Sequence, residues 1–200
     1  MNKKLTLTIL VACILSLGIQ AAEIPEVGTY AAGVQLSFGS IDHDSFSNDQ
    51  DGVAQVQFYV DYYFKPAWAV ELAVNNGSNV DDWICDNVED TDDFCTAGDT
   101  GNPDAFENDL DFTNLIVAIR HDTRVSESSF IYGKLGAQYY DYEMKNSNSI
   151  FEKDSGTGVF SELGWNYQWS NNLSTNVGYQ YMGMGDLSTS SLTFGLGYSF

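Results

Sequence analysis

Apolar residues alternate with small or polar ones along most of this chain, and a repeat of two residues is the pattern of β-strands. The carboxyl-terminal stretch shows it most clearly. There, one set of alternate positions is apolar or aromatic: Leu192, Phe194, Leu196, Tyr198 and Phe200. The positions between them are small or polar: Thr193, Gly195, Gly197 and Ser199. A strand with this pattern has one apolar face and one face of small or polar residues.

The same alternation predicts eight strands. We expect them at about 28–40, 53–64, 67–75, 110–120, 131–140, 159–169, 173–181 and 192–200. In the fourth, we assign Leu115, Val117 and Ile119 to the apolar face, and Asn114, Ala118 and Arg120 to the other. The expected connections alternate between short and long. The short ones are 65–67, about 121–128 and 170–172, and the longer ones are 41–52, 76–109, 142–156 and 183–189.

Aromatic residues of the apolar faces gather at the short-turn ends of the expected strands, as in Phe64, Trp68, Trp169 and Tyr198. Tyr and Phe number 12 each and Gly 18, with three prolines. After the amino-terminal leader, no apolar run approaches the roughly 20 residues that a membrane-spanning helix needs. These features predict an all-β protein. In a membrane barrel, the aromatic residues would form a girdle at the bilayer surface.

The chain resembles the small eight-stranded outer-membrane barrels of Gram-negative bacteria, OmpA-like in the transmembrane part and OmpX-like in size. Their assembly signal is a polar residue, a glycine two places on, and aromatics at the third-last and last positions. Thr193, Gly195, Tyr198 and Phe200 fill those places. The resemblance implies an eight-stranded antiparallel up-and-down transmembrane β-barrel, with outer-membrane lipid, lipopolysaccharide and the barrel-assembly machinery as partners. We expect no counterpart of the periplasmic wall-binding domain of full OmpA-type proteins, so a wall-tethering role is not carried over.

Two soluble alternatives remain open at this stage. The terminal stretch also suits an ordinary edge strand, and the whole pattern suits a lipocalin-like barrel with its apolar faces inward. A period of two does not say which face points inward. One face is rich in Gly, Gln, Asn and Ser, which is too polar for a soluble ligand-binding core, and this favours the membrane barrel.

The amino terminus has the composition of a secretory signal peptide. Lys3 and Lys4 precede an apolar run to Ile19, and small residues follow near Ala21. We therefore predict a signal peptide over 1–21 and a barrel domain over 22–200. Residues 10–13 also suit a lipoprotein cleavage box, which would leave Cys13 as a lipid-modified terminus; the apolar run beyond Cys13 disfavours it.

The charge balance is strongly acidic. The chain has eight basic and 28 acidic residues, and loss of Lys3 and Lys4 with the leader would leave six basic ones. Nucleic acid is therefore not an expected partner, because binding requires a basic surface. On the polar, inward face we expect a cluster of charges. Its members are Asp61, Glu71, Arg120, Lys134 and Glu162. In an eight-stranded barrel, such side chains fill the interior.

The longest expected loop, 76–109, has 11 acidic residues and no Lys or Arg. Cys85 and Cys95 lie within it, and an even pair in an exported chain predicts a disulfide. The acidic residues nearest these cysteines give a weak metal-site hypothesis: Asp86, Glu89, Asp90, Asp92 and Asp93. No EF-hand spacing is present. We expect weakly bound divalent cations at most, bridging lipopolysaccharide phosphates, and no other cofactor.

Catalysis is not expected. The two histidines, His43 and His121, fall at opposite ends of the predicted barrel, and no nucleophile motif stands near either. The sequence therefore predicts a structural or surface-interaction barrel that acts in envelope integrity, adhesion, or host or phage contact through its external loops. The alternative is a narrow, porin-like, cation-preferring pore gated by the interior ion pairs. The external ligand is not identified by the sequence.

Overall fold

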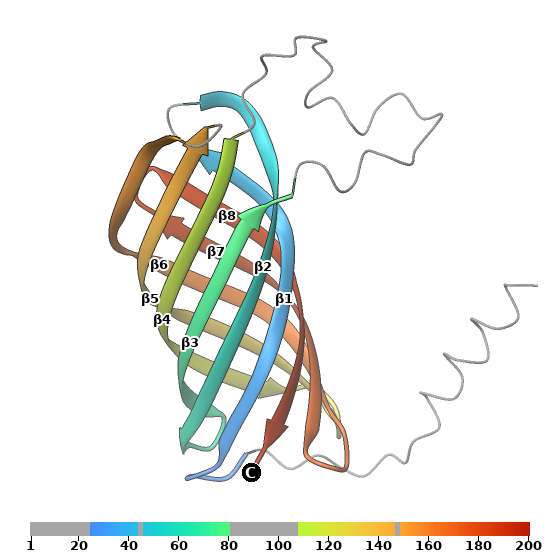
Figure 1. The fold of residues 1–200 in the computed structure, drawn as a ribbon. Coiled ribbons are helices and arrows are strands. Elements are labelled where there is room, and N and C mark those ends of the chain that lie inside the picture. Colours follow the sequence, from blue (N-terminus) through green and yellow to red (C-terminus); the bar gives the residue numbers. More distant parts are fainter. Residues whose placement is uncertain (1–24, 44–45, 81–107, 147–148) are drawn as a thin grey trace, which may run out of the picture.

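The computed structural model describes residues 25–43, 46–80, 108–146 and 149–200, and these residues form a closed barrel of eight strands (Figure 1). Each strand pairs antiparallel with the next, and β8 pairs with β1. The predicted fold class is confirmed. The strands are β1 Tyr30–His43, β2 Phe46–Lys65, β3 Trp68–Asn79, β4 Asn108–Arg124, β5 Ser129–Asn146, β6 Ser149–Gln168, β7 Leu173–Met184 and β8 Leu187–Ser199.

The last residue helps to close the barrel. The Phe200 N–H donates to the Tyr30 carbonyl at 2.8 Å, and the Tyr30 N–H donates to the Phe200 carbonyl at 3.1 Å. The two rings stack with centroids 6.2 Å apart. Closure leaves no unpaired sheet edge, which is the requirement for a sheet surrounded by lipid.

The two faces of the wall have opposite chemistry. Outward side chains are apolar and exposed, such as Leu72 at 53% and Leu135 at 70%. Inward side chains include fully buried polar groups such as Gln57 and Glu71, both at 0%. A soluble barrel has the reverse arrangement, so the lipocalin-like alternative is wrong. No helix among the described residues is long and apolar enough to cross a membrane.

The phase assigned to the fourth strand is confirmed. Leu115, Val117 and Ile119 are exposed on the outer face of β4, whereas Asn114 and Arg120 are buried inside. Outward aromatic residues form a girdle at the short-turn end. Its ring contacts include Tyr30 with Tyr62, Trp165 with Tyr167, Tyr167 with Trp169, and Trp68 with His121.

Several expected loops are too long, because strands continue through them. β1 extends to His43 and β2 begins at Phe46, so most of 41–52 is strand. β5 extends to Asn146 and β6 begins at Ser149, so most of the expected loop 142–156 is strand. The expected 183–189 loop shrinks to the turn between Met184 and Leu187. Polar residues were read as loop, but a hydrogen-bonded antiparallel ladder tolerates them where both faces are polar.

Inward glycines make room for inward tyrosines. A Cβ on Gly33 would lie 2.5 Å from the Tyr59 ring, and one on Gly164 would lie 2.5 Å from the Tyr132 ring. Tyr59 and Tyr132 are buried, because they occupy the inward positions of the alternation. An eight-stranded barrel has room for side chains but not for a wide channel. The glycines therefore set where the large rings lie.

Candidate functional site

Six charged side chains from five neighbouring strands meet inside the barrel, and we call them the ion-pair layer. They are Asp61 of β2, Glu71 of β3, Arg120 and Asp122 of β4, Lys134 of β5 and Glu162 of β6. All face inward because they occupy the polar positions of the alternation. Register brings them to one depth: Asp61 is opposite Glu71, Arg120 is opposite Lys134, and Lys134 is opposite Glu162.

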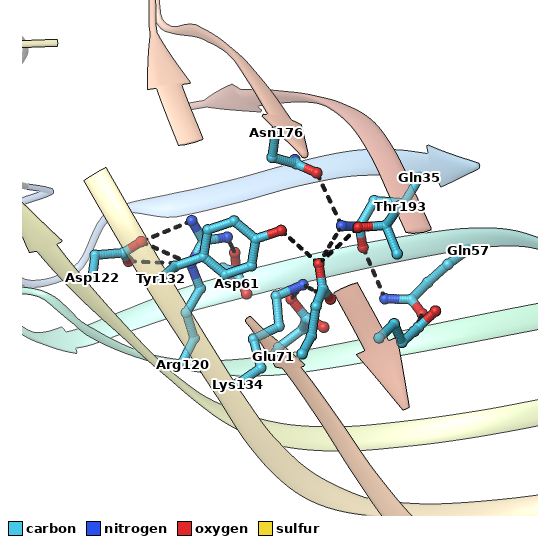
Figure 2. A network of polar contacts seen from close by, with 12 residues as sticks. Gln35, Gln57, Asp61, Glu71, Arg120, Asp122, Tyr132, Lys134, Asn176 and Thr193 are labelled. Atoms are coloured by element: carbon cyan, nitrogen blue, oxygen red, sulfur yellow. Dashed lines mark hydrogen bonds and ion pairs between the residues drawn. The ribbon is translucent and has the colours of Figure 1, made fainter. Parts of the chain in front are cut away.

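Arg120 binds two carboxylates (Figure 2). Its Nη1 lies 3.0 Å from Asp61 Oδ2, and its Nη2 lies 2.9 Å from Asp122 Oδ1. The Arg120 Nε–H also donates to Asp122, at 3.1 Å. The Tyr63 hydroxyl donates to Asp122 Oδ2 at 3.0 Å, and the Tyr132 ring lies 4.7 Å from the guanidinium carbon. A buried charge needs this number of partners.

Lys134 also binds two carboxylates. Its Nζ lies 2.7 Å from Glu71 Oε2 and 3.0 Å from Glu162 Oε2. The same ammonium lies 5.1 Å from the Tyr59 ring centroid and 5.4 Å from that of Tyr132. Lys134 therefore joins β3 to β6 across the inside of the barrel.

Glu162 links the ion-pair layer to a set of neutral polar side chains. Its Oε1 accepts hydrogen bonds from the Tyr132 hydroxyl at 2.5 Å and from Gln35 Nε2 at 2.9 Å. Gln35 in turn bonds Asn176 and Gln57 (Figure 2). Hydrogen bonds thus continue from the ion-pair layer into β1, β2 and β7. All eight strands contribute to this network, since Thr193 of β8 donates its hydroxyl to Glu162 Oε1 at 3.3 Å.

The structure brings together all five charged residues expected in the interior. Sequence reasoning missed Asp122, because residues 121–128 were expected to be a turn, whereas β4 continues to Arg124. The signal was available: Asp122 is two residues beyond Arg120 and thus on the same face of an extended strand. Gln35 and Asn176 fall on the polar face of the alternation, but the sequence pattern does not link their amide groups to Glu162.

A second layer closes the interior nearer the long-loop end. It consists of buried apolar and aromatic side chains, which we call the apolar plug: Ile41, Val53, Leu110, Phe112, Tyr142, Met184 and Leu187. The Tyr140 and Tyr142 rings stack above the ion-pair layer with centroids 6.0 Å apart. Sequence reasoning missed this layer too. Ile41, Tyr142, Met184 and Leu187 lie beyond the ends of the expected strands, and the inward-facing Val53, Leu110 and Phe112 lie at the ends of theirs.

The β5–β6 hairpin carries an exposed charge group. Lys153 Nζ is hydrogen-bonded to Glu143 and lies 3.7 Å from Asp141 Oδ1. The hydrogen bond with Glu143, and then the nearby Asp141 carboxylate, raise the pKa of Lys153 above its usual value. Tyr140 donates to Asp154 at 3.1 Å on the same hairpin. This end of the barrel is therefore rich in carboxylates.

The remaining predicted residues are dispersed or undescribed. Tyr198 is exposed on the outer wall, Thr193 is buried, and a Cβ on Gly195 would lie 2.5 Å from Asn176 Oδ1. His121 lies beside Trp68, far along the wall from His43, the last residue of β1. Three predictions lie outside the described residues: the signal peptide, the Cys85–Cys95 disulfide, and the acidic metal hypothesis. That last set comprises Asp86, Glu89, Asp90, Asp92 and Asp93.

A family model described as "Outer membrane protein beta-barrel domain" matches residues 9–200. Comparison with curated proteins gives no match. Among solved structures, the chain is similar to Ail of Yersinia pestis in complex with the heparin analogue sucrose octasulfate. The identity is 19%, with 88% of this chain and 100% of that chain covered and a TM-score of 0.56.

Two further structures share the fold. Neisserial surface protein A is 12% identical, with 86% and 99% of the two chains covered and a TM-score of 0.62. OprG of Pseudomonas aeruginosa is 16% identical, with 88% and 97% covered and a TM-score of 0.57. At these identities, the likeness concerns the fold alone.

Proposed function

This chain belongs to the outer-membrane β-barrel family, and from that premise we propose that it is a structural and surface-interaction barrel. It lies in the outer membrane. Short turns of such barrels face the periplasm and longer loops face outward. The ends of β3 and β4 at Asn79 and Asn108 therefore belong to the outer side, and the Trp68 girdle to the periplasmic side.

The side-chain-filled interior is the observation that carries this proposal. The ion-pair layer lies toward the short-turn end of the barrel and the apolar plug toward the long-loop end. Buried ions held by several partners do not leave their positions at low cost. A solute would have to displace both layers. We therefore assign the activity of the protein to its outer surface rather than to its lumen.

The chemistry of that surface favours cationic partners. The 76–109 segment has 11 acidic and no basic residues, and the β5–β6 hairpin adds Asp141, Glu143 and Asp154. Ail was solved with a heparin analogue, which is polyanionic. The acidic surface of the present chain repels such a ligand. We propose basic patches on host or phage proteins as partners, together with divalent cations that bridge the carboxylates to lipopolysaccharide phosphates.

Adhesion of bacteria displaying the protein tests this proposal. We expect displaying cells to adhere to epithelial monolayers better than cells without the protein, and salt to weaken the effect by screening. Amide replacement at the five central acidic positions should abolish the gain: Asp86→Asn, Glu89→Gln, Asp90→Asn, Asp92→Asn and Asp93→Asn. Lys153→Ala, which removes a positive charge from the same end, should leave adhesion intact or raise it. Equal adhesion with and without the protein would contradict the proposal.

The acid excess of the ion-pair layer favours one second candidate, a narrow cation-preferring pore. Four carboxyl groups there face two basic groups. An acidic constriction selects cations when it conducts. For this function, the Lys134 ion pairs with Glu71 and Glu162 would have to break and re-form. Electrical recording separates it from the surface function.

We also propose that the protein is not an enzyme. The His121 ring packs at a tilt against Trp68 with ring centroids 4.3 Å apart, and its Nδ1 lies 3.2 Å from the Ala67 carbonyl oxygen. This places the ring in the girdle, away from the carboxylates of the outer hairpin. Ester hydrolysis and lipid A composition should be the same in cells with wild-type protein and with His43→Ala. A change in either would contradict this part of the proposal.

A further inference from the structure

Two carboxyl groups of the ion-pair layer face one another directly. Asp61 on β2 and Glu71 on β3 are register partners in the antiparallel pair, so their side chains leave the wall side by side. Directly opposite residues of an antiparallel pair have Cβ atoms about 4.5–5.5 Å apart, which allows two carboxyl groups to meet. Both side chains are fully buried.

Among the described residues, each of the two carboxyl groups has one oxygen that takes part in neither a hydrogen bond nor an ion pair. Asp61 Oδ2 is bound by Arg120, and Glu71 Oε2 is bound by Lys134. Asp61 Oδ1 and Glu71 Oε1 have no donor among the described residues. Two ionised carboxylates in this arrangement would repel each other and leave two buried acceptors unsatisfied, which is costly. One proton between them removes both problems, because it neutralises a charge and supplies the missing donor.

The described neighbouring side chains supply neither a further positive charge nor a hydrogen-bond donor to these two oxygens. Among the described residues, Arg120 and Lys134 are the buried basic side chains, and both are shared with a further carboxylate. The titratable and charged groups facing the pair are Tyr59 and Tyr63 of β2, Arg120 and Asp122 of β4, Tyr132 and Lys134 of β5, and Glu162 of β6. The Tyr63 and Tyr132 hydroxyls donate to Asp122 and Glu162 instead.

We propose that Asp61 and Glu71 form a proton-binding site in the barrel interior, which holds one proton in a carboxyl–carboxylate hydrogen bond at neutral pH. The proton comes from water during folding. Asp122 and Glu162 stay ionised, each with a basic partner and a tyrosine donor. With the proton bound, three negative and two positive charges remain in the layer. Its loss leaves four negative charges against two and sets the β2 and β3 carboxylates against each other.

Infrared spectroscopy of the folded full-length barrel in lipid nanodiscs tests this proposal. A protonated carboxyl group has a C=O stretch separate from that of a carboxylate and shifts in heavy water. We expect this band in wild-type protein at neutral pH. It should vanish in Asp61→Asn and in Glu71→Gln, because an amide replaces the proton as donor, and persist in Asp141→Asn on the outer hairpin. A missing band in the wild type, or a band that survives both interior substitutions, would overturn the proposal.

The pH dependence of unfolding gives a second measurement on the same proteins. The folded barrel holds one proton that the unfolded chain releases near neutral pH, so stability falls as pH rises. The unfolding equilibrium constant should increase by about tenfold per pH unit until the site empties. In Glu71→Gln and in Asp61→Asn, unfolding should release one proton fewer, so the unfolding constant should rise less steeply with pH. Equal slopes in wild type and both variants would overturn the proposal, whatever the outcome of the adhesion assay.

Discussion

Lys134 is the residue whose loss should disturb the interior most. Its ammonium is the common partner of Glu71 and Glu162, and all three side chains are buried. Lys134→Ala would leave buried carboxylates without their cation, which costs about 3–5 kcal/mol when a buried pair is broken. We expect a lower free energy of unfolding in urea by that amount. Lys153→Ala, at the exposed hairpin, is the matched control and should change stability little. Similar stabilities for the two variants would contradict this interpretation.

Ala67 has a backbone conformation that favours glycine. Its φ is 65°, in the left-handed region, and it lies in the tight turn between β2 and β3. Its carbonyl accepts the Asp122 N–H at 2.9 Å, so the turn is held to β4. Ala67→Gly should therefore raise the free energy of unfolding by up to about 1 kcal/mol, through relief of the Cβ clash. Asn172, with φ of 64°, is a type that tolerates this region, and Asn172→Gly should give a smaller gain. A loss of stability in Ala67→Gly would show that the turn is not strained.

At the scale of single strands, the contact between Gly164 and Tyr132 makes a packing prediction. A methyl group at Gly164 would lie 2.5 Å from the tyrosine ring and 2.6 Å from the Val177 carbonyl oxygen. Overpacking of this kind costs about 1–3 kcal/mol. Gly164→Ala should lower the unfolding midpoint and weaken the Tyr132 bond to Glu162. Gly133→Ala, where a Cβ meets nothing within 4 Å, is the control and should be near neutral. Equal midpoints would contradict the packing account.

The strand faces followed from the sequence because a period of two residues leaves only two phases. Leu115 and Arg120 were assigned correctly to opposite faces in this way. The strand ends did not follow, because polarity marks where the lipid stops and not where the backbone ladder stops. For this reason, the sequence prediction put Asp122 in a turn and not in the strand. The burial of Leu110, Phe112 and Leu187 was not predicted either. Near the long-loop end the inward face becomes apolar, as in a soluble core.

At the scale of the whole molecule, the barrel has a different interior at each end. The ion-pair layer lies toward the short-turn end and the apolar plug toward the long-loop end, with the glutamine-rich chain of Gln35, Gln57 and Gln180 between them. The outer wall carries the apolar belt that lipid requires. Because both layers fill the interior with side chains, we infer that the barrel is closed and that its outer surface carries the function.

Single-channel recording from the mature barrel in planar bilayers tests whether the interior is closed. Samples should first be shown to be folded by their heat-sensitive mobility in gels, and recorded across a range of salt concentrations. We predict no stable conductance steps in wild-type protein, and none in Lys134→Ala, because the apolar plug remains when the ion pairs are lost. Stable cation-selective steps in the wild type would contradict the account and make Lys134, Glu71 and Glu162 the gate of a pore.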